Sequence, residues 1–334
     1  MKFAFNKCTI LLLLLVSASG SGTAGAVVLP KCAAPPFEGE AAVKAIKDEL
    51  ALPYHKTMMV NESANGRLAY CLSRSGMEES GLSFGVSQLD LRTNAKAWLA
   101  FVAILTKAVN DDPSVKFEDS DLTYMNARLA GANAPRAKDL LKKKDTRLDA
   151  LLDRANAALQ TASSKQTIDA IHVEDVKAEV AFIRNVQSTL AGSPVGGDRL
   201  LGASLAAKLL VMDYHNLFGS IEGKLKPFMM TGTVATAEGP LKIGGDSLAV
   251  SDIARFVLST KQGRGCKANE RAELLRRMGY VFNVAKASGD KTTWTKEDRS
   301  FFSQELPSIL GERCVSRQVD LGHLRTITEQ PLWQ

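Results

Sequence analysis

The chain has 334 residues, of which 45% are hydrophobic and 23% charged, and its formal net charge at pH 7 is +6. These values are typical of a globular chain with one large domain or two modest ones, and they exclude a disordered, collagenous or polytopic membrane protein. The small basic excess is spread along the chain rather than gathered in an arm, so nucleic acid is not an expected partner.

The first 26 residues have the pattern of a secretory signal peptide. A basic start precedes an apolar run from Cys8 to Ala18, which is too short to remain as a membrane-spanning helix. Small residues at 24–26 then supply a cleavage site before Val27. We therefore expect a secreted or periplasmic protein with no stable membrane insertion after cleavage. The oligomeric state is left open.

The cysteines that remain after cleavage form an even set: Cys32, Cys71, Cys266 and Cys314. An even count in an exported chain predicts two disulfides. Among the three possible connectivities we favour a bridge from Cys71 to the C-terminal half, because it would tie the candidate hairpin described below to the rest of the domain. No metal-ligand spacing occurs among the cysteines and histidines, so neither a metal nor another cofactor is expected.

Helical periodicity dominates the mature chain. Apolar residues recur at steps of three and four in residues 38–52, 94–109, 136–162, 167–191, 199–218, 247–260, 267–287 and 296–310. Asn94 precedes one of the most apolar runs and is predicted to cap its helix. The charged segments 136–162 and 167–191 are predicted to form an antiparallel helical hairpin.

Only two regions predict β-structure. Residues 82–91 are punctuated by glycine, and residues 233–237 could pair with 240–243. We expect Phe84 to point into the core and Gly85 to adopt a conformation that a side chain would obstruct. The predicted fold is therefore mainly α, with a small β-hairpin at about 80–91.

The segment with the most chemical content runs from residue 58 to residue 91. Glu62 ends an apolar stretch, Tyr70 follows, and the sequence Ser83-Phe84-Gly85 lies farther on. This arrangement is similar to the core of the lysozyme superfamily, particularly the phage-type muramidases. In those enzymes a Glu ends the first helix, an aromatic residue follows about eight positions later, and a hairpin carries a Thr/Ser, aliphatic or aromatic, Gly pattern.

The resemblance implies a lysozyme-like α+β fold and an activity. It implies an N-terminal lobe over 27–130, a helical hairpin insertion over 131–195, and a helical C-terminal lobe over 196–334 that completes a cleft. The implied reaction is cleavage of a β-1,4-linked amino-sugar polymer, with peptidoglycan as the expected substrate. A hydrolase and a lytic transglycosylase both remain open.

Breaking a glycosidic bond requires protonation of the leaving oxygen, and Glu62 is the candidate general acid. A carboxyl that donates a proton near neutral pH must be held neutral, and Met58, Met59 and Val60 are expected to provide apolar surroundings. Arg67 is not expected to pair with Glu62, since the two lie some 140° apart around a helix at roughly 100° per residue.

The identity of a second carboxylate stays open. The phage-type enzymes carry an Asp soon after the aromatic residue, but no acidic residue follows Tyr70 until Glu78 and Glu79. Glu78, Glu79 and Asp90 are the candidates, unless Ser83 alone positions water or a lytic transglycosylase needs only one acid. The structural alternatives are a solvated turn for Glu78 and Glu79, and a helix cap or a partner of Arg92 for Asp90.

A second cluster lies at the end of the helix predicted to begin near residue 199. Asp213, Tyr214 and Asn216 are predicted to bind substrate together with Tyr70 and Gln88, because aromatic faces and amides are common in saccharide sites. The plainer alternative is that Asp213 caps a turn and that His215, next to it in the sequence, packs against its neighbours. The absence of a Gly-x-Ser-x-Gly elbow argues against serine hydrolase chemistry.

A second function of a different class also fits the sequence. A non-enzymatic periplasmic or extracellular helical protein could bind a glycan or a partner protein through the same surface, with Glu62 serving as a cap or pairing with Arg67. The surroundings of Glu62 distinguish the two functions, because a general acid needs a concave pocket that faces Ser83 and Gln88.

Overall fold

The computed structural model describes residues 27–28, 32, 35–74, 80–237, 239–264 and 270–311. The predicted signal peptide, Glu78, Glu79, Cys266 and Cys314 lie outside these residues. The described chain is mainly helical with two small antiparallel sheets, which confirms the predicted fold class.

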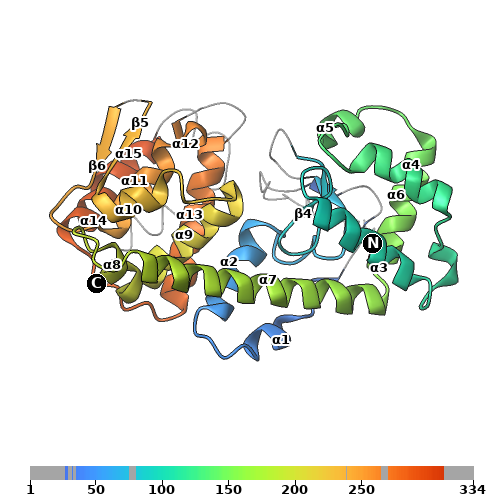
Figure 1. Cartoon of the computed structure of the whole chain (residues 1–334), viewed down its shortest axis with the longest axis horizontal. Helices are drawn as coiled ribbons and strands as arrows, with labels where there is room; N and C mark the ends of the chain where they lie inside the picture. Colours follow the sequence, from blue (N-terminus) through green and yellow to red (C-terminus); the bar gives the residue numbers. More distant parts are fainter. Residues whose placement is uncertain are drawn as a thin grey trace, which may run out of the picture.

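The chain forms two lobes joined by helices (Figure 1). The first lobe contains a four-stranded antiparallel sheet in the order β1 (Val27–Val28), β2 (Ser73–Arg74), β3 (Leu82–Phe84) and β4 (Leu89–Asp90). The predicted hairpin is formed by β3 and β4, with Ser83 opposite Asp90 and Phe84 opposite Leu89. Gly85 lies in the connecting turn with a φ of +79°, as predicted.

Helices complete the first lobe around this sheet. They are α3 (Ala95–Ala108), the 3₁₀ helix η1 (Pro113–Val115), α4 (Asp119–Leu129), α5 (Ala137–Leu140) and α6 (Thr146–Leu159). The side chain of Asn94 accepts hydrogen bonds from the amides of Lys96 and Ala97, so the predicted cap of α3 is confirmed.

Two helices connect the lobes. After α1 (Glu40–Lys44), α2 (Ala51–Asn61) lies between the lobes and packs against α7, α9 and α13. The 28-residue helix α7 (Ala162–Thr189) extends for about 42 Å and passes along both lobes (Figure 1). Because it packs against α3 at one end and against α8 and α9 at the other, it fixes the spacing of the two lobes.

The second lobe begins at α8 and is a cluster of helices with one exposed hairpin. Its elements are α8 (Gly197–Ala203), α9 (Leu205–Phe218), α10 (Leu225–Thr231), β5 (Thr233–Thr236), β6 (Gly239–Lys242), α11 (Val250–Ser259), α12 (Lys261–Arg264), α13 (Glu270–Ala287), α14 (Lys296–Ser300), the π-helical turn η2 (Phe301–Glu305) and α15 (Leu306–Gly311). The β5–β6 pairing agrees with the hairpin predicted there.

The segment predicted as an antiparallel helical hairpin is arranged differently. Asp145 caps α6 by accepting a hydrogen bond from the amide of Leu148, and this break separates α6 from the short α5. Helix α6 lies across the end of α7 rather than along it (Figure 1). Most of α7 packs instead against helices of both lobes, because its apolar residues extend well beyond the reach of the shorter α6.

Candidate active site between the lobes

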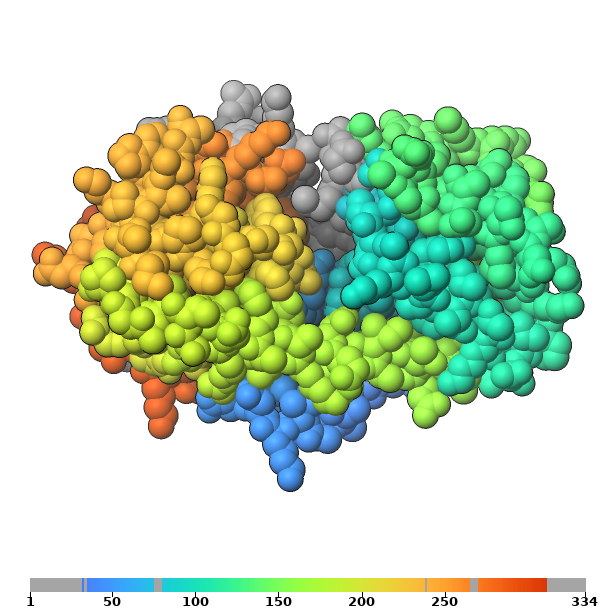
Figure 2. All heavy atoms as spheres, in the orientation of Figure 1, coloured from blue at the N-terminus to red at the C-terminus, as the bar shows by residue number. Residues whose placement is uncertain are grey.

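The surface of the protein is hollowed between the two lobes (Figure 2). Helix α2 ends in this region, and its C-cap residue is Glu62, whose amide donates to the carbonyl of Met58 at 2.9 Å. The side chain of Glu62 is 17% exposed. Glu62 is therefore partly accessible at a helix end between the lobes.

The carboxylate of Glu62 is held by two groups from the second lobe. Its Oε1 lies 2.5 Å from Nη1 of Arg277 on α13 and accepts a hydrogen bond of 2.8 Å from Nδ2 of Asn216 on α9. The predicted substrate-binding residue Asn216 thus contacts the candidate acid directly.

Arg277 is shared between two carboxylates. Its Nη2 and Nε donate to Asp213 at 2.7 Å and 3.1 Å, and Asp213 also accepts a hydrogen bond from Asn61 at 2.9 Å. Burial by itself lowers the pKa of Arg277, but the charges of Asp213 and Glu62 outweigh it and raise that pKa. The guanidinium is therefore a permanent positive charge beside Glu62.

Sequence reasoning missed Arg277. The available signal was its position inside a helix whose neighbouring residues Leu274, Leu275 and Met278 are apolar and buried. A cation on such a helix must find a partner, since an unpaired buried charge is costly. The expected apolar setting of Glu62 needs correction for the same reason, because the partners of its carboxylate are polar and Met58 is fully buried in the core.

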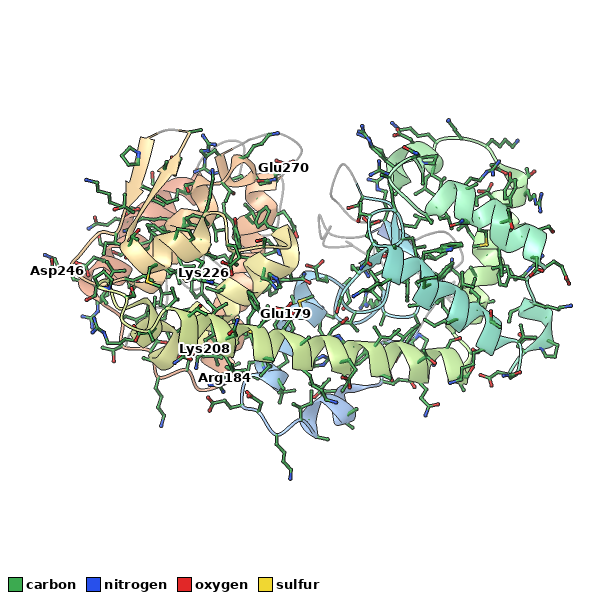
Figure 3. The ribbon with its side chains drawn as sticks, in the orientation of Figure 1. Glu179, Arg184, Lys208, Lys226, Asp246 and Glu270 are labelled. Atoms are coloured by element: carbon green, nitrogen blue, oxygen red, sulfur yellow. A yellow bond between two sulfur atoms is a disulfide. The ribbon has the colours of Figure 1, made fainter. Side chains whose placement is uncertain are left out.

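Two further carboxylates lie on α7. Glu179, which Figure 3 shows between the lobes, contacts Nδ1 of His215 at 2.9 Å, and the ring of His215 stacks on Phe182 at 3.8 Å. The His215 side chain therefore packs against its neighbours, which agrees with the structural alternative given above for this residue.

Asp175 lies one helical turn before Glu179 and accepts a hydrogen bond from Ser87 in the β3–β4 turn. Burial raises the pKa of Asp175. Burial also raises the pKa of Tyr54, and the charges of Glu179, Asp213, Asp175 and Glu62 raise it further, so the charges of all four carboxylates act on one buried phenol. Asp175 and Glu179 are four residues apart, which places them on one face of a helix, and this spacing is the signal by which the sequence could have indicated the pair.

Of the candidate site residues in the hairpin, Gln88 and Asp90 bind groups of the hairpin and its flanking turns, whereas Ser83 is buried. The Ser83 hydroxyl is buried and makes no hydrogen bond in the part of the chain that the structure describes. Gln88 has a φ of +50°, donates to the carbonyl of Gly85 at 2.9 Å and accepts from the hydroxyl of Ser73 at 2.5 Å. Asp90 accepts from the amides of Gly81, Arg92 and Thr93, so it is a backbone partner of Arg92 rather than a helix cap, since α3 is capped by Asn94.

Tyr70 and Tyr214 lie away from the Glu62 carboxylate. Tyr70 is fully buried, and its hydroxyl donates to Asp169 at 2.7 Å, which corrects the expectation that it lines the cleft. Tyr214 is half-buried against Phe218, with ring centroids 4.5 Å apart. It is rotated by roughly 200° from Asn216 around the axis of α9, so the two cannot face the same ligand.

The structure pairs Cys32 with Cys71 in a disulfide. This pairing corrects the favoured bridge from Cys71 to the C-terminal half. Cys71 is buried two residues before β2, and the N-terminal segment lies close to it because β1 runs antiparallel to β2. Among the described residues, no group of three or more His, Cys, Asp or Glu side chains could hold a metal ion.

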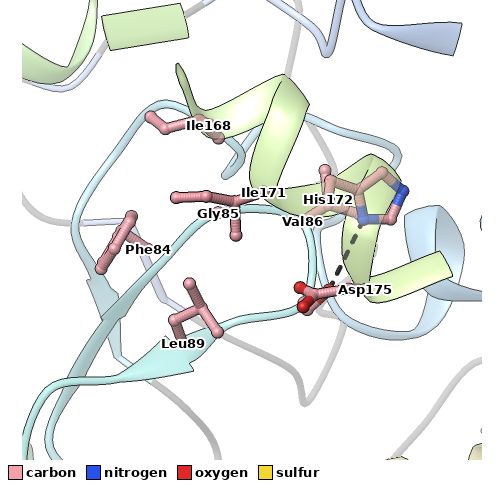
Figure 4. Close-up of a pocket in the computed structure, with 9 residues that line it drawn as sticks. Phe84, Gly85, Val86, Leu89, Ile168, Ile171, His172 and Asp175 are labelled. Carbon is pink, nitrogen blue, oxygen red and sulfur yellow. Dashed lines mark hydrogen bonds between the residues drawn. The ribbon is translucent and has the colours of Figure 1, made fainter. Parts of the chain in front are cut away.

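A buried histidine pair lies behind the hairpin turn. Nδ1 of His55 on α2 and Nε2 of His172 on α7 share a hydrogen bond of 2.8 Å. Burial lowers the pKa of His55 to about 4 and that of His172 to about 3. Figure 4 shows His172 and Asp175 beside the turn, around a cavity of about 10 Å³ that has room for one water molecule at most.

No family model matches the chain, and neither a curated protein nor a solved structure does. Within the described ranges, none of the helices combines the length and the apolar character needed to cross a bilayer.

Proposed function

We propose that the protein is an exported glycan hydrolase of the lysozyme type that cleaves a β-1,4-linked amino-sugar polymer, with peptidoglycan as the substrate. The observation that supports it is the placement of Glu62. This carboxylate ends a helix that lies between the two lobes, is partly exposed, and is held by Arg277 and Asn216 from the second lobe.

Loss of the negative charge of Glu62 would not leave Arg277 without a partner. The guanidinium keeps its two hydrogen bonds to Asp213, so no buried charge would be left alone.

In the proposed reaction, protonated Glu62 donates its proton to the glycosidic oxygen as the bond from that oxygen to the anomeric carbon breaks. A carboxylate on the other side of the sugar would stabilise the positive charge or activate water. Asp175 and Glu179 on α7 are the candidates, because their charges act on the same buried Tyr54 as that of Glu62, whereas Asp90 accepts hydrogen bonds from backbone amides. If the enzyme is a lytic transglycosylase, Glu62 alone is sufficient.

The test of the proposal is Glu62→Gln, which keeps the shape of the side chain and its contacts with Asn216. We expect this variant to fold and to lose wall-clearing activity by about 10² to 10⁴ in a zymogram with purified cell walls. Glu222→Gln is the matched control, since Glu222 is exposed and its ion-pair partner is Lys226 on the same surface.

The alternative is a non-enzymatic glycan-binding or partner-binding protein, and the ion pair between Glu62 and Arg277 favours it, since such a pair can serve stability alone. A folded Glu62→Gln variant that clears walls at the wild-type rate would refute the role of Glu62. Wild-type protein that sediments with purified walls but releases no fragments would favour the binding function.

A further inference from the structure

A pocket lies in the second lobe, on the side of α9 that carries Tyr214. It has a volume of about 240 Å³ and opens between α9, the β5–β6 turn and the α11–α12 corner. Asn216 contacts Glu62 from a different face of α9. This pocket is therefore separate from the surroundings of Glu62.

One wall of the pocket is aromatic. The rings of Tyr214 and Phe218 lie 4.5 Å apart, and Tyr214 meets Phe256 at 5.7 Å in an edge-to-face arrangement. Phe256 is held from behind by Phe228, which stacks on it at 5.5 Å. The wall is therefore a rigid apolar surface, of the kind that packs against the flat face of a sugar ring.

The rim of the pocket is cationic. Lys224, Lys261 and Arg264 line it, and no carboxylate does so among the described residues. Neither lysine has an ion-pair partner within the described parts of the chain, and the guanidinium of Arg264 is held near the rim by the carbonyl of Thr260 at 3.4 Å. The two lysines place two positive charges at one opening, which attracts an anionic ligand.

Three uncharged polar residues, Ser259, Thr260 and Gln262, also line the pocket. The hydroxyls of Ser259 and Thr260 donate to backbone carbonyls of α11 at 2.7 Å, so they can only accept from the hydroxyls of a sugar, whereas the amide of Gln262 can donate and accept. The hydroxyl of Tyr214 has no hydrogen-bond partner among the described residues, so it is available for the same purpose.

We propose that this pocket binds an anionic saccharide, meaning a sugar that carries a carboxylate or a phosphate. The ring would pack on Tyr214 and Phe218, and the anionic group would lie between the two lysines. A neutral sugar would lack the charge interaction and a bare anion would lack the stacking, so the site selects a ligand with both features. This inference does not depend on Glu62 or on the proposed hydrolysis.

Calorimetric titration of the full chain tests the proposal with two matched pairs of ligands. N-acetylmuramic acid is compared with N-acetylglucosamine, and glucose 6-phosphate with glucose; inorganic phosphate is titrated alone. We expect at least one anionic sugar to bind about tenfold more tightly than its neutral counterpart and than phosphate, and the better pair identifies the anionic group.

Variants assign the binding to this pocket. Lys261→Gln and Lys224→Gln should each weaken binding of the anionic sugar by about three- to tenfold, whereas Lys226→Gln, on the neighbouring helix and paired with Glu222, should not. Glu62→Gln should also leave the binding unchanged, which separates this result from that of the activity assay.

Equal affinity for the neutral and anionic sugars would overturn the proposal, as would phosphate binding as tightly as the sugar phosphate. Binding that survives both lysine substitutions would likewise overturn it. Phe218→Leu provides a further measurement, because it keeps the apolar volume but removes the ring. A loss of affinity for the anionic sugar in that variant, with inorganic phosphate unaffected, would support stacking.

Discussion

Arg277 links three elements of the candidate site through one buried guanidinium. It lies on α13, pairs with Glu62 at the end of α2, and donates twice to Asp213 on α9. Removing one partner from a buried charge cluster is more damaging than losing a surface pair, because the remaining charges stay buried without compensation.

We therefore expect Arg277→Gln to lower the free energy of unfolding by about 3 to 5 kcal/mol. Urea denaturation followed by circular dichroism measures the change. Arg184→Gln is the matched control, since Arg184 pairs with Asp48 at the surface and should contribute about 0 to 1 kcal/mol. Equal effects of the two substitutions would contradict the importance of the buried cluster.

The buried pair His55 and His172 gives the fold a pH dependence whose sign follows from burial. In the folded state burial lowers the pKa of His55 to about 4 and of His172 to about 3, while an unfolded histidine titrates near 6.5. Below about pH 6.5 the unfolded chain takes up protons that the folded chain does not, so stability falls as the pH falls toward 4.

This dependence predicts that His172→Gln flattens the acid limb of the stability profile. Between pH 7 and pH 4.5 the variant should lose about 2 kcal/mol less than the wild type, since one titrating group has been removed. Urea unfolding at both pH values measures the difference. Parallel profiles for the two proteins would show that His172 is not kept neutral by the fold.

At the scale of the elements, the β3–β4 hairpin combines a buried ring with a buried hydroxyl. Phe84 is fully buried, and its ring centroid lies 5.5 Å from that of Phe101 on α3. This confirms the prediction that Phe84 points into the core. Ser83, its neighbour, is also buried, although adjacent strand residues point to opposite faces of the sheet. Both faces of β3 are therefore covered.

Phe84→Ala is expected to lower the free energy of unfolding by about 3 to 5 kcal/mol through the cavity that it leaves. Ser83→Ala should be neutral or slightly stabilising, because it removes a buried hydroxyl without a hydrogen-bond partner in the described structure. Thermal melts of both variants test this contrast. If Ser83→Ala is the more destabilising change, its hydroxyl must bind a group such as an ordered water.

At the scale of the whole molecule, the Cys32–Cys71 disulfide joins the N-terminal segment to the first lobe. It closes a loop with a sequence separation of 39 residues. In the loop-entropy description such a closure stabilises the fold by about 4 kcal/mol. The bridge therefore matters most for the lobe that contains the β3–β4 hairpin.

The double variant Cys32→Ser with Cys71→Ser should melt at a lower temperature than the oxidised wild type, by an amount that corresponds to about 2 to 4 kcal/mol. A reductant should lower the melting temperature of the wild type more than that of the double variant. Peptide mapping under non-reducing conditions checks the pairing itself, and a peptide linking Cys71 to Cys266 or Cys314 would contradict it.

Local patterns in the sequence were sufficient for the helical class, the cap at Asn94, the inward direction of Phe84 and the conformation of Gly85. Each of these depends on residues within a few positions, where periodicity, capping and steric freedom act directly. The helix that ends at Glu62 does not belong to this group, because periodicity predicted a helix over 38–52, whereas the structure has α1 over Glu40–Lys44 and α2 over Ala51–Asn61.

The partners of Glu62 were decided only by the tertiary structure. Asn216 and Arg277 are distant from Glu62 in the sequence and come from two different helices. The contact between Tyr70 and Asp169, which holds the buried tyrosine, also joins residues far apart in the sequence. Helix α7, the cysteine pairing and the carboxylates Asp175 and Glu179 were likewise placed by packing. Charge compensation and burial depend on which surfaces meet in space, and a local pattern carries no information about a partner so many residues away.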